Sequence, residues 1–357
     1  MRMKKIILIV PSLVKGGVER IVSILSKELS KYYQVYVVIY HGPVEYEVSG
    51  KLINLKTPAG SFLRKIKNTF HRVVKLRKLI KDISPDFIVS FMGNLQPILT
   101  LNPVIVSIHI DPDFTHLYRK ILLKTIYKLP NVKKIITVSQ GIEEKLNNSY
   151  HLKKTKTIYN PIDLKLISQK LLTQKPVNFD YILAVGRLSR EKGFDILINA
   201  FAKSNLKNKI KLIILGEGKE RNNLEKLIVE LDLKSQVLLN GKVDNPFIYM
   251  KHAIFLVLSS RFEGFGNVII ESLACDAPVI ACNCQSCPSE IIENGKNGLL
   301  VPVEEVESLK MAMDKLFYDK ELYVKLKKNA RRSVKKYDIK NIVQDWIDLF
   351  EGINIIS

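Results

Sequence analysis

The sequence predicts an α/β protein with two doubly wound domains, each built on a parallel sheet covered by helices on both faces. Short apolar runs of strand length alternate with stretches in which apolar residues recur at helical spacing. This alternation stops near residues 164–178 and then resumes. The chain has 357 residues, which exceeds one usual α/β domain, so we expect two separate cores.

The first half opens with a strand over 4–10, a loop that contains Gly16 and Gly17, and a helix that starts near Val18. The apolar run that ends at Pro11 has only five residues, too few for a signal peptide, so we expect a buried first strand. The rest of this half is predicted as strands over 35–40, 87–91, 103–108 and 134–138, with helices over 62–80 and 117–129.

The second half repeats the alternation after a polar segment. It is predicted as strands over 181–185, 211–215, 237–239, 254–258 and 278–281, with helices over 195–203, 219–231, 267–275 and 304–317. An amphipathic helix over 339–350 contains Trp346, the only tryptophan, and is expected to pack back on the first domain. The predicted boundaries are a first domain over 1–165, a linker over 166–178, a second domain over 179–337 and a C-terminal segment over 338–357.

Positive charge is concentrated in the first half. The formal net charge is +21, and residues 51–81 hold ten Lys or Arg without an acid. Residues 114–142 hold six more, again without an acid. Such a field attracts phosphate-bearing surfaces, which means nucleic acid or an anionic membrane.

The four cysteines lie within 13 residues, without the spread of a disulfide framework. Their spacing matches neither a zinc ribbon nor a ferredoxin, so we expect small buried side chains rather than a metal site. They are Cys275, Cys282, Cys284 and Cys287. A reduced, cytoplasmic protein fits this pattern.

The loop after strand 181–185 places two cations close together before a helix. In open α/β sheets ligands bind at the carboxyl ends of strands, and two facing sheets would put this edge at a central cleft. Arg187 offers a planar fork and Lys192 a mobile point charge, which together suit the two phosphates of a nucleoside diphosphate. Two solvated surface cations are the alternative explanation.

The loop after strand 254–258 combines glycines with acids. Gly264 and Gly266 allow close backbone approach to a ligand, and a helix with free N–H groups begins near Asn267. Glu263 precedes this helix and Glu271 lies inside it, so both carboxylates are positioned to accept hydrogen bonds from sugar hydroxyls. The predicted donor site is therefore centred on residues 261–271, with solvated acids as the alternative.

These two loops resemble the signature of the retaining GT-B glycosyltransferases known as family 4. The similarity extends along the chain and includes bacterial transferases that extend lipid-linked oligosaccharides, among them N-acetylgalactosamine transferases of N-glycosylation. Its other marks are the Gly-Gly-Val-Glu-Arg loop at 16–20, Thr137-Val-Ser139, Tyr159-Asn160-Pro161-Ile-Asp163 and Leu215-Gly216-Glu217-Gly218. The family commonly has glycine where this chain has Cys287.

The resemblance implies roles for matching residues. Arg187 and Lys192 would bind the donor diphosphate and neutralise the leaving group, Glu263 would hold the sugar, and His109 would contact it. Glu271 would bind the ribose. The remaining implied donor-binding residues are Gly16, Gly17, Gly186, Gly216, Gly264, Phe265, Gly266, Asn267 and Val268. The first domain would bind the acceptor and the second the nucleotide sugar.

The resemblance also implies the type of reaction. Cations and helix N–H groups that meet the charge of the departing diphosphate lower the barrier, so neither a metal nor a cofactor is expected. In this family retention is ascribed to front-face attack, so no side-chain nucleophile is assigned. The donor would be a UDP-sugar or a GDP-sugar, and it would be a co-substrate.

The predicted acceptor is a lipid-linked saccharide at a membrane. Apolar residues among the cations of 62–80 suggest an amphipathic helix that docks on an anionic membrane from the cytoplasmic side. A core-facing helix with a solvated basic side is the alternative. A nucleic-acid-binding protein is disfavoured because the basic stretches lack interleaved aromatic residues. A non-hydrolysing sugar-nucleotide epimerase of the same fold is the nearest enzymatic alternative.

Overall fold

The computed structural model describes residues 2–14, 16–57, 62–112, 120, 124–171, 174–285 and 287–353, with side chains of α2 described from residue 68 onward. The chain forms two compact units. The first unit contains residues up to Pro161 together with those from Ile339, and the second spans Ile162–Asp338. Both are α/β units on parallel sheets, which confirms the predicted fold class.

Within the described part of the first unit, seven parallel strands form one sheet in the order β3-β2-β1-β4-β5-β6-β7. In chain order they are β1 (Lys5–Val10), β2 (Gln34–Ile39), β3 (Lys51–Asn54), β4 (Phe87–Phe91), β5 (Val104–Ile108), β6 (Val132–Thr137) and β7 (Thr155–Thr157). Strands β1, β4 and β5 are almost wholly apolar and buried, as expected for central parallel strands covered on both faces.

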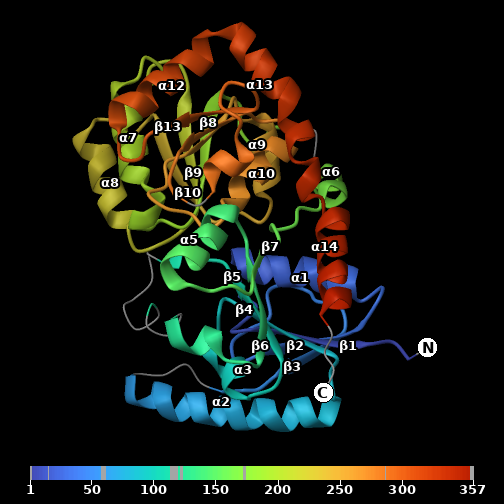
Figure 1. Ribbon diagram of the computed structural model, residues 1–357. Coiled ribbons are helices and arrows are strands. Elements are labelled where there is room, and N and C mark those ends of the chain that lie inside the picture. The colour runs from blue at the N-terminus through green and yellow to red at the C-terminus, as the bar shows by residue number, and fades with distance from the viewer. Residues whose placement is uncertain are drawn as a thin grey trace. The chain divides into compact units, whose positions relative to one another are not determined.

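The helices of the first unit lie on both faces of this sheet. They are α1 (Gly17–Leu29), α2 (Phe62–Ile83), α3 (Leu95–Leu99), α5 (Gln140–Tyr150) and α14 (Ile339–Gly352). Helix α14, at the C-terminal end, packs beside α1, and α2 runs beside α3 on the opposite face (Figure 1). Residues 117–119 and 121–123 of the helix predicted over 117–129 lie outside the described residues, and a short 3-10 turn occupies Ile126–Lys128.

Aromatic packing attaches α14 to the first unit. Trp346 and Phe350 are buried in the same core as residues of β1, β2 and β4. The ring of Phe350 lies 4.7 Å from that of Phe87 and 5.6 Å from that of Tyr33, measured between centroids. Burying three large rings together supplies much of the apolar contact that holds the helix there.

The described part of the second unit contains six parallel strands in the order β10-β9-β8-β11-β12-β13. In chain order they are β8 (Tyr181–Val185), β9 (Lys211–Leu215), β10 (Val237–Gly241), β11 (Leu256–Leu258), β12 (Val279–Cys282) and β13 (Gly298–Val301). The helices are α6 (Leu164–Lys170), α7 (Phe194–Lys203), α8 (Arg221–Glu230), α9 (Pro246–His252), α10 (Asn267–Ala274), α11 (Pro288–Ile291), α12 (Val306–Tyr318) and α13 (Lys320–Ser333). Helix α6 occupies the start of the segment that the sequence assigned to a linker.

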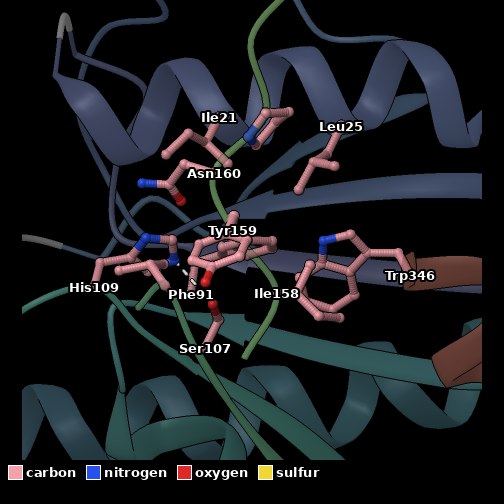
Figure 2. A pocket seen from close by; sticks show the side chains of 11 residues that line it. Ile21, Leu25, Phe91, Ser107, His109, Ile158, Tyr159, Asn160 and Trp346 are labelled. Atoms are coloured by element: carbon pink, nitrogen blue, oxygen red, sulfur yellow. Dashed lines mark hydrogen bonds between the residues drawn. The ribbon is translucent and has the colours of Figure 1, made fainter. Parts of the chain in front are cut away.

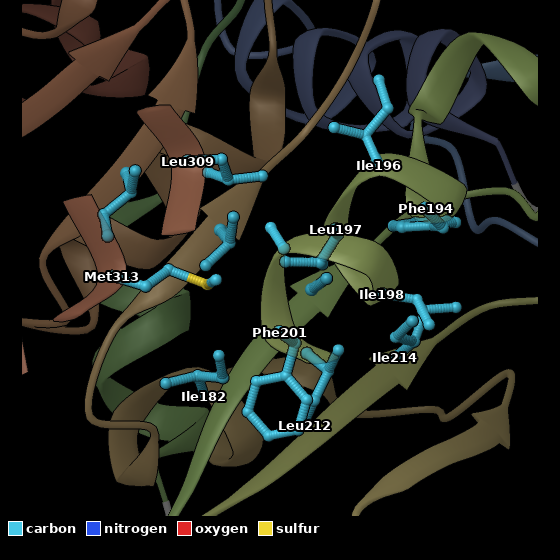
Figure 3. Close-up of a cluster of buried hydrophobic side chains, with 14 of the residues drawn as sticks. Ile182, Phe194, Ile196, Leu197, Ile198, Phe201, Leu212, Ile214, Leu309 and Met313 are labelled. Atoms are coloured by element: carbon cyan, nitrogen blue, oxygen red, sulfur yellow. The ribbon is translucent and has the colours of Figure 1, made fainter. Parts of the chain in front are cut away.

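The core of the second unit lies between its sheet and helices α7 and α12. Leu197 and Phe201 of α7 meet Leu309 and Met313 of α12 above the strand residue Ile182 (Figure 3). These side chains are fully or almost fully buried. A packed core of this kind fixes the strands, and with them the loops that leave their carboxyl ends.

Candidate active site

In the second unit the strand order reverses direction between β8 and β11, which lie side by side. The connections from these two strands run to opposite sides, so the loops after them, 186–193 and 259–266, flank the switch point of the sheet. Ligands of open α/β sheets bind at such a point. The two loops that the sequence singled out therefore belong to one edge of one sheet.

An ion pair joins the two loops at this edge. Lys192 Nζ donates to Glu263 Oε1 at 2.5 Å, and the hydroxyl of the buried Ser260 donates to the same oxygen at 2.7 Å. The side chains of Lys192 and Glu263 are only 22% and 10% exposed. A cation and a carboxylate from different loops are thus held together in partly buried surroundings, where charge interactions are strengthened.

Glycines create the space around this pair. A Cβ atom at Gly186 would lie 3.4 Å from Cδ of Lys192, so the lysine stem passes directly over that glycine. At Gly216, where φ is +144°, a Cβ atom would lie 1.8 Å from the carbonyl oxygen of Gly186. Only glycine fits at Gly216, because any side chain would both strain the backbone and collide with the neighbouring loop.

Arg261 fastens the two loops from the side. Its guanidinium donates to both carboxylate oxygens of Asp195 at 2.9 and 2.8 Å and to Oε1 of Glu304 at 2.7 Å. The guanidinium also donates to the backbone oxygen of Arg190 at 2.6 Å. The backbone N–H of Arg261 donates to the backbone oxygen of Glu191 at 2.8 Å. Although Arg261 begins the predicted donor segment, its guanidinium serves as a clamp within the protein.

The pKa values of the clamp follow from these contacts. The hydrogen bonds that Arg261 donates to Asp195 raise the pKa of the guanidinium above its usual range. Burial of the Asp195 carboxyl would raise its pKa, but the hydrogen bonds and charge of Arg261 outweigh burial and lower it. Both groups therefore stay charged at neutral pH.

Helix α10 starts at this edge and carries the second predicted acid. Gly266 precedes the helix, Asn267 is its first residue, and Glu271 is buried within it. Phe265 is also buried, and the thiol of Cys287 donates to its backbone oxygen. The φ of Cys287 is −161°, which is outside the left-handed region that would favour the glycine implied by the family resemblance.

Arg187 differs from Lys192 in its surroundings. Its side chain is exposed at the start of loop 186–193, and no hydrogen bond to its guanidinium is found among the described residues. Its charge lies close enough to Glu191 to help lower the pKa of that carboxyl, against the opposing effect of burial. Of the two cations predicted to bind the diphosphate, Lys192 is thus held by an acid and Arg187 is open to solvent.

The first unit contains a small pocket near the carboxyl ends of β4 and β5. His109, directly after β5, lines it together with Ser107 and Asn160, as Figure 2 shows. Apolar side chains close the rest of the pocket, including Trp346 from α14 and Phe91 from β4. Of these residues only His109 was assigned a role from the sequence.

The histidine ring is held on two sides. Its Nε2 lies 2.9 Å from the hydroxyl oxygen of Ser107, and its ring centroid lies 5.8 Å from that of Phe91. The Phe91 ring is in turn 6.1 Å from the ring of Trp346. Burial lowers the pKa of His109 to about 3, so the imidazole is neutral at physiological pH.

A buried ion pair supports the chain just beyond His109. Lys145 of α5 donates to both oxygens of Asp111, at 2.9 and 2.7 Å, and the Asp111 side chain is fully buried. Asp111 begins an Asp-Pro-Asp sequence that ends at Asp113, a pattern that sequence reasoning passed over. Asp113 lies outside the described residues, and the Asp111 carboxylate is engaged by lysine.

Gly16 and Gly17 lie at the start of α1 in the first unit. Gly16 precedes the helix with φ −151°, and Gly17 is its first residue. The other predicted site residues, from Gly186 to Glu271, belong to the second unit. The structure therefore gathers the second-unit residues at one sheet edge, and it places His109 and the two glycines in the first.

The cysteines are buried thiols. Burial raises the pKa of Cys275, Cys282 and Cys284 to about 12, and that of Cys287 well above its ordinary value. At neutral pH they are protonated and behave as small apolar groups. Among the described residues, no group of three or more His, Cys, Asp or Glu is arranged to hold a metal ion.

Comparison with known proteins places this fold among the glycosyltransferases. The sequence matches the family description "Glycosyltransferase Family 4" over residues 15–166 and "Glycosyl transferases group 1" over residues 169–333. The chain belongs to this glycosyltransferase family.

Its relatives include two proteins of Campylobacter jejuni. One is N-acetylgalactosamine-N,N'-diacetylbacillosaminyl-diphospho-undecaprenol 4-alpha-N-acetylgalactosaminyltransferase, 32% identical over 98% of this chain and 100% of the relative. The other is an alpha-1,4-N-acetyl-D-galactosaminyltransferase that acts on GalNAc-alpha-(1->4)-GalNAc-alpha-(1->3)-diNAcBac-PP-undecaprenol, 26% identical over 98% and 99%.

Solved structures show the same fold. A glycosyltransferase from Rickettsia africae superposes with a TM-score of 0.84 at 20% identity, covering both chains completely. Anabaena HepE in complex with UDP-glucose gives a TM-score of 0.82 at 20% identity over 99% of this chain and 100% of HepE. The predicted GT-B fold and family are thus confirmed, whereas the roles of individual residues stay predictions.

Proposed function

We propose that this glycosyltransferase moves a hexose or N-acetylhexosamine, with retention, from a UDP-sugar to a membrane lipid-linked saccharide in glycan or polysaccharide assembly. The observation that carries this proposal is the end-to-end similarity to the Campylobacter jejuni enzyme, whose name specifies a diphospho-undecaprenol acceptor. The complex of HepE with UDP-glucose favours UDP over GDP as the carrier.

The chemistry follows from where charge develops. The bond between the anomeric carbon and the diphosphate oxygen breaks while the acceptor oxygen bonds to the same face of the sugar. The acceptor proton passes to the departing phosphate oxygen. Lys192, Arg187 and the first N–H groups of α10 would stabilise the diphosphate, and one such donor is typically worth about 2.7 to 4 kcal/mol in the transition state.

Glu263 has two roles in this scheme. Before the donor binds, its carboxylate holds Lys192 at the switch point. With the donor bound, the same carboxylate is a hydrogen-bond acceptor for sugar hydroxyls, as the family resemblance implies. No cofactor or metal is needed in this proposal, because the protein cations balance the diphosphate.

Helix α2 supports membrane docking through its outward face. Phe70 and Val74, one turn apart, are 72% and 49% exposed, and the exposed Lys78 and Lys81 continue the same face. The opposite face, including Leu76, is buried. Exposed apolar side chains beside lysines are the pattern of a helix that lies in an anionic membrane interface.

Other cations of α2 face the protein. Arg72 donates to Thr57 Oγ1 at 2.9 Å and lies over the Tyr40 ring at 4.8 Å, and Lys75 donates to the backbone oxygen of Leu55. Within the described residues, no helix is long and apolar enough to cross a membrane. We propose peripheral attachment at the cytoplasmic face, with α2 as the contact.

Product release tests the reaction. The full-length protein is incubated with UDP- or GDP-sugars, with and without undecaprenyl-diphosphate saccharides, in Mg²⁺ or EDTA. We expect UDP release that requires the lipid acceptor and persists in EDTA. Interconversion of the sugar without acceptor would instead indicate an epimerase, and loss of transfer in EDTA would refute metal independence.

Flotation with anionic liposomes tests the membrane contact. The variant Phe70→Ser, Lys78→Glu, Lys81→Glu should lose most binding, because it removes apolar insertion and reverses charge on one face. The matched control is Lys325→Glu, Lys328→Glu on the exposed side of α13, which should float like the wild type. Equal flotation of the α2 variant and the wild type would refute docking through α2.

A further inference from the structure

One residue that lines the pocket of the first unit has a buried polar atom whose hydrogen-bonding capacity is not satisfied within the described residues. Nδ1 of His109 is buried, and it has no hydrogen-bond partner among the described residues. It belongs to the edge of the ring away from Ser107, whose hydroxyl meets Nε2 (Figure 2). A buried polar atom without a partner is rare in folded proteins and calls for an explanation.

The hydroxyl of Ser107 decides which ring nitrogen carries the proton. Ser107 is buried, and within the described part of the chain its hydroxyl oxygen has His109 Nε2 as its hydrogen-bond partner. If Nε2 donated to Ser107, the serine proton and the Nδ1 lone pair would both lack partners. If Ser107 donates to Nε2, only the Nδ1 proton lacks a partner, and this proton belongs to a residue that lines the pocket.

Aromatic packing keeps the ring in this orientation. Phe91 lies against the imidazole and Trp346 lies against Phe91, with tilted rings at both contacts. A ring flip would replace the nitrogen at Ser107 with a carbon and forfeit the hydrogen bond. The rotamer and the proton position are thus fixed together.

We propose that Ser107 is a positioning residue whose hydroxyl holds His109 as the neutral Nδ1–H tautomer, so that Nδ1–H is the ring atom available to donate to a saccharide oxygen. The low pKa of His109, about 3, agrees with a neutral ring. The saccharide partner of Nδ1–H rests on the proposed glycosyltransfer, whereas the tautomer rests on the geometry of Ser107 and His109.

The tautomer is measured directly by ¹⁵N NMR of histidine side chains in the ligand-free full-length protein. The His109→Gln spectrum assigns the signals of His109 among the six histidines. We expect a protonated Nδ1 and an unprotonated Nε2 in the wild type. Ser107→Thr, which keeps the hydroxyl, should preserve this pattern, and Ser107→Ala should lose it.

A wild-type ring protonated at Nε2 would overturn the proposal, and so would an unchanged Nδ1–H signal in Ser107→Ala. In the transfer assay kcat/KM of Ser107→Ala should fall about tenfold, the worth of one hydrogen bond, with recovery in Ser107→Thr. The Kd for UDP should not change, because the diphosphate loops belong to the second unit. If no saccharide is transferred but the NMR result holds, only the proposed function fails.

Discussion

In the pocket of the first unit the side chains are rings and neutral polar groups, whereas at the switch point of the second unit they are ion pairs. His109 is neutral and held by Ser107 and Phe91. In the second unit Lys192 is bound to Glu263, and Arg261 is bound to two acids. The same parallel strand order therefore supports two different kinds of chemistry.

The difference shows which part of the structure carries function. A doubly wound sheet fixes where loops converge, because carboxyl ends of parallel strands lie at one edge. It does not fix what those loops contain. The charged edge suits a diphosphate, whereas the neutral pocket is small and lined mostly by apolar side chains. Four substitutions or conditions would break or sharpen this contrast.

The largest expected effect is on stability in the first unit. Lys145→Ala leaves the fully buried Asp111 carboxylate without its lysine, and breaking a buried pair in this way costs about 3–5 kcal/mol. Chemical unfolding monitored by tryptophan fluorescence measures it, since Trp346 lies in this unit. Lys31→Ala, which removes an exposed pair with Glu28, is the control and should change little. Similar unfolding of both variants would contradict the prediction.

The second-largest expected effect is on turnover, at the charged sheet edge of the second unit. Lys192→Ala should lower kcat by about 10²–10³-fold, because it removes a cation from the developing diphosphate charge. The circular dichroism spectrum should stay unchanged. Lys203→Ala, in the same unit and on an exposed pair with Glu307, should keep wild-type turnover. Near-normal turnover in Lys192→Ala would remove this lysine from the mechanism.

The clamp should matter less than the cation that it positions. Arg261→Lys keeps the charge but loses the bidentate contact with Asp195, so we expect kcat/KM to fall about tenfold. Isothermal titration should show weaker UDP binding. Arg221→Lys, at a partly exposed arginine of α8 that pairs with Glu217 and Glu225, is the matched control. A wild-type kcat/KM would show that the loops keep their positions without the fork.

Acid pH should affect the first unit through His109. The folded-state pKa is about 3 and the ordinary value is 6.5. Between these two pKa values His109 is protonated in the unfolded chain but not in the folded chain. Its contribution to stability is therefore complete above pH 6.5 and declines as the pH falls. Between pH 7 and pH 5 the free energy of unfolding of the wild type should fall by about 1–2 kcal/mol more than that of His109→Gln. Parallel pH profiles for both proteins would disprove a buried neutral histidine.

The central strands were predicted from the sequence, whereas three of the four edge strands among the described residues were missed. Strands β8 and β9 match their predicted bounds because each is a continuous apolar run that is buried on both faces. Strands β3, β7 and β13 were missed. Strand β13 has only four residues, GLLV. The sequences of β3 and β7, KLIN and TKT, are also short, and all of their residues are at least partly exposed. Such strands form because a neighbouring strand offers hydrogen bonds, not because of their own apolar pattern.

The basic helix α2 shows a second limit of sequence reasoning. Its cations look alike in the sequence, and its periodicity cannot tell solvent from a polar loop that accepts hydrogen bonds. The fold turns Arg72 and Lys75 toward Thr57 and Leu55 and leaves Lys78 and Lys81 exposed. The variants that test membrane docking could therefore be chosen only once the structure was known.

By itself the sequence determined the alternation of strands and helices, the two glycine-rich loops with their cations and acids, and the excess of positive charge. These features depend on neighbouring residues, whose spacing the chain fixes directly. Only the tertiary structure joined Lys192 to Glu263, closed the Arg261 clamp and set Trp346 behind Phe91 and His109. Those partners are far apart along the chain, and only the packing of each sheet against its helices brings them within contact distance.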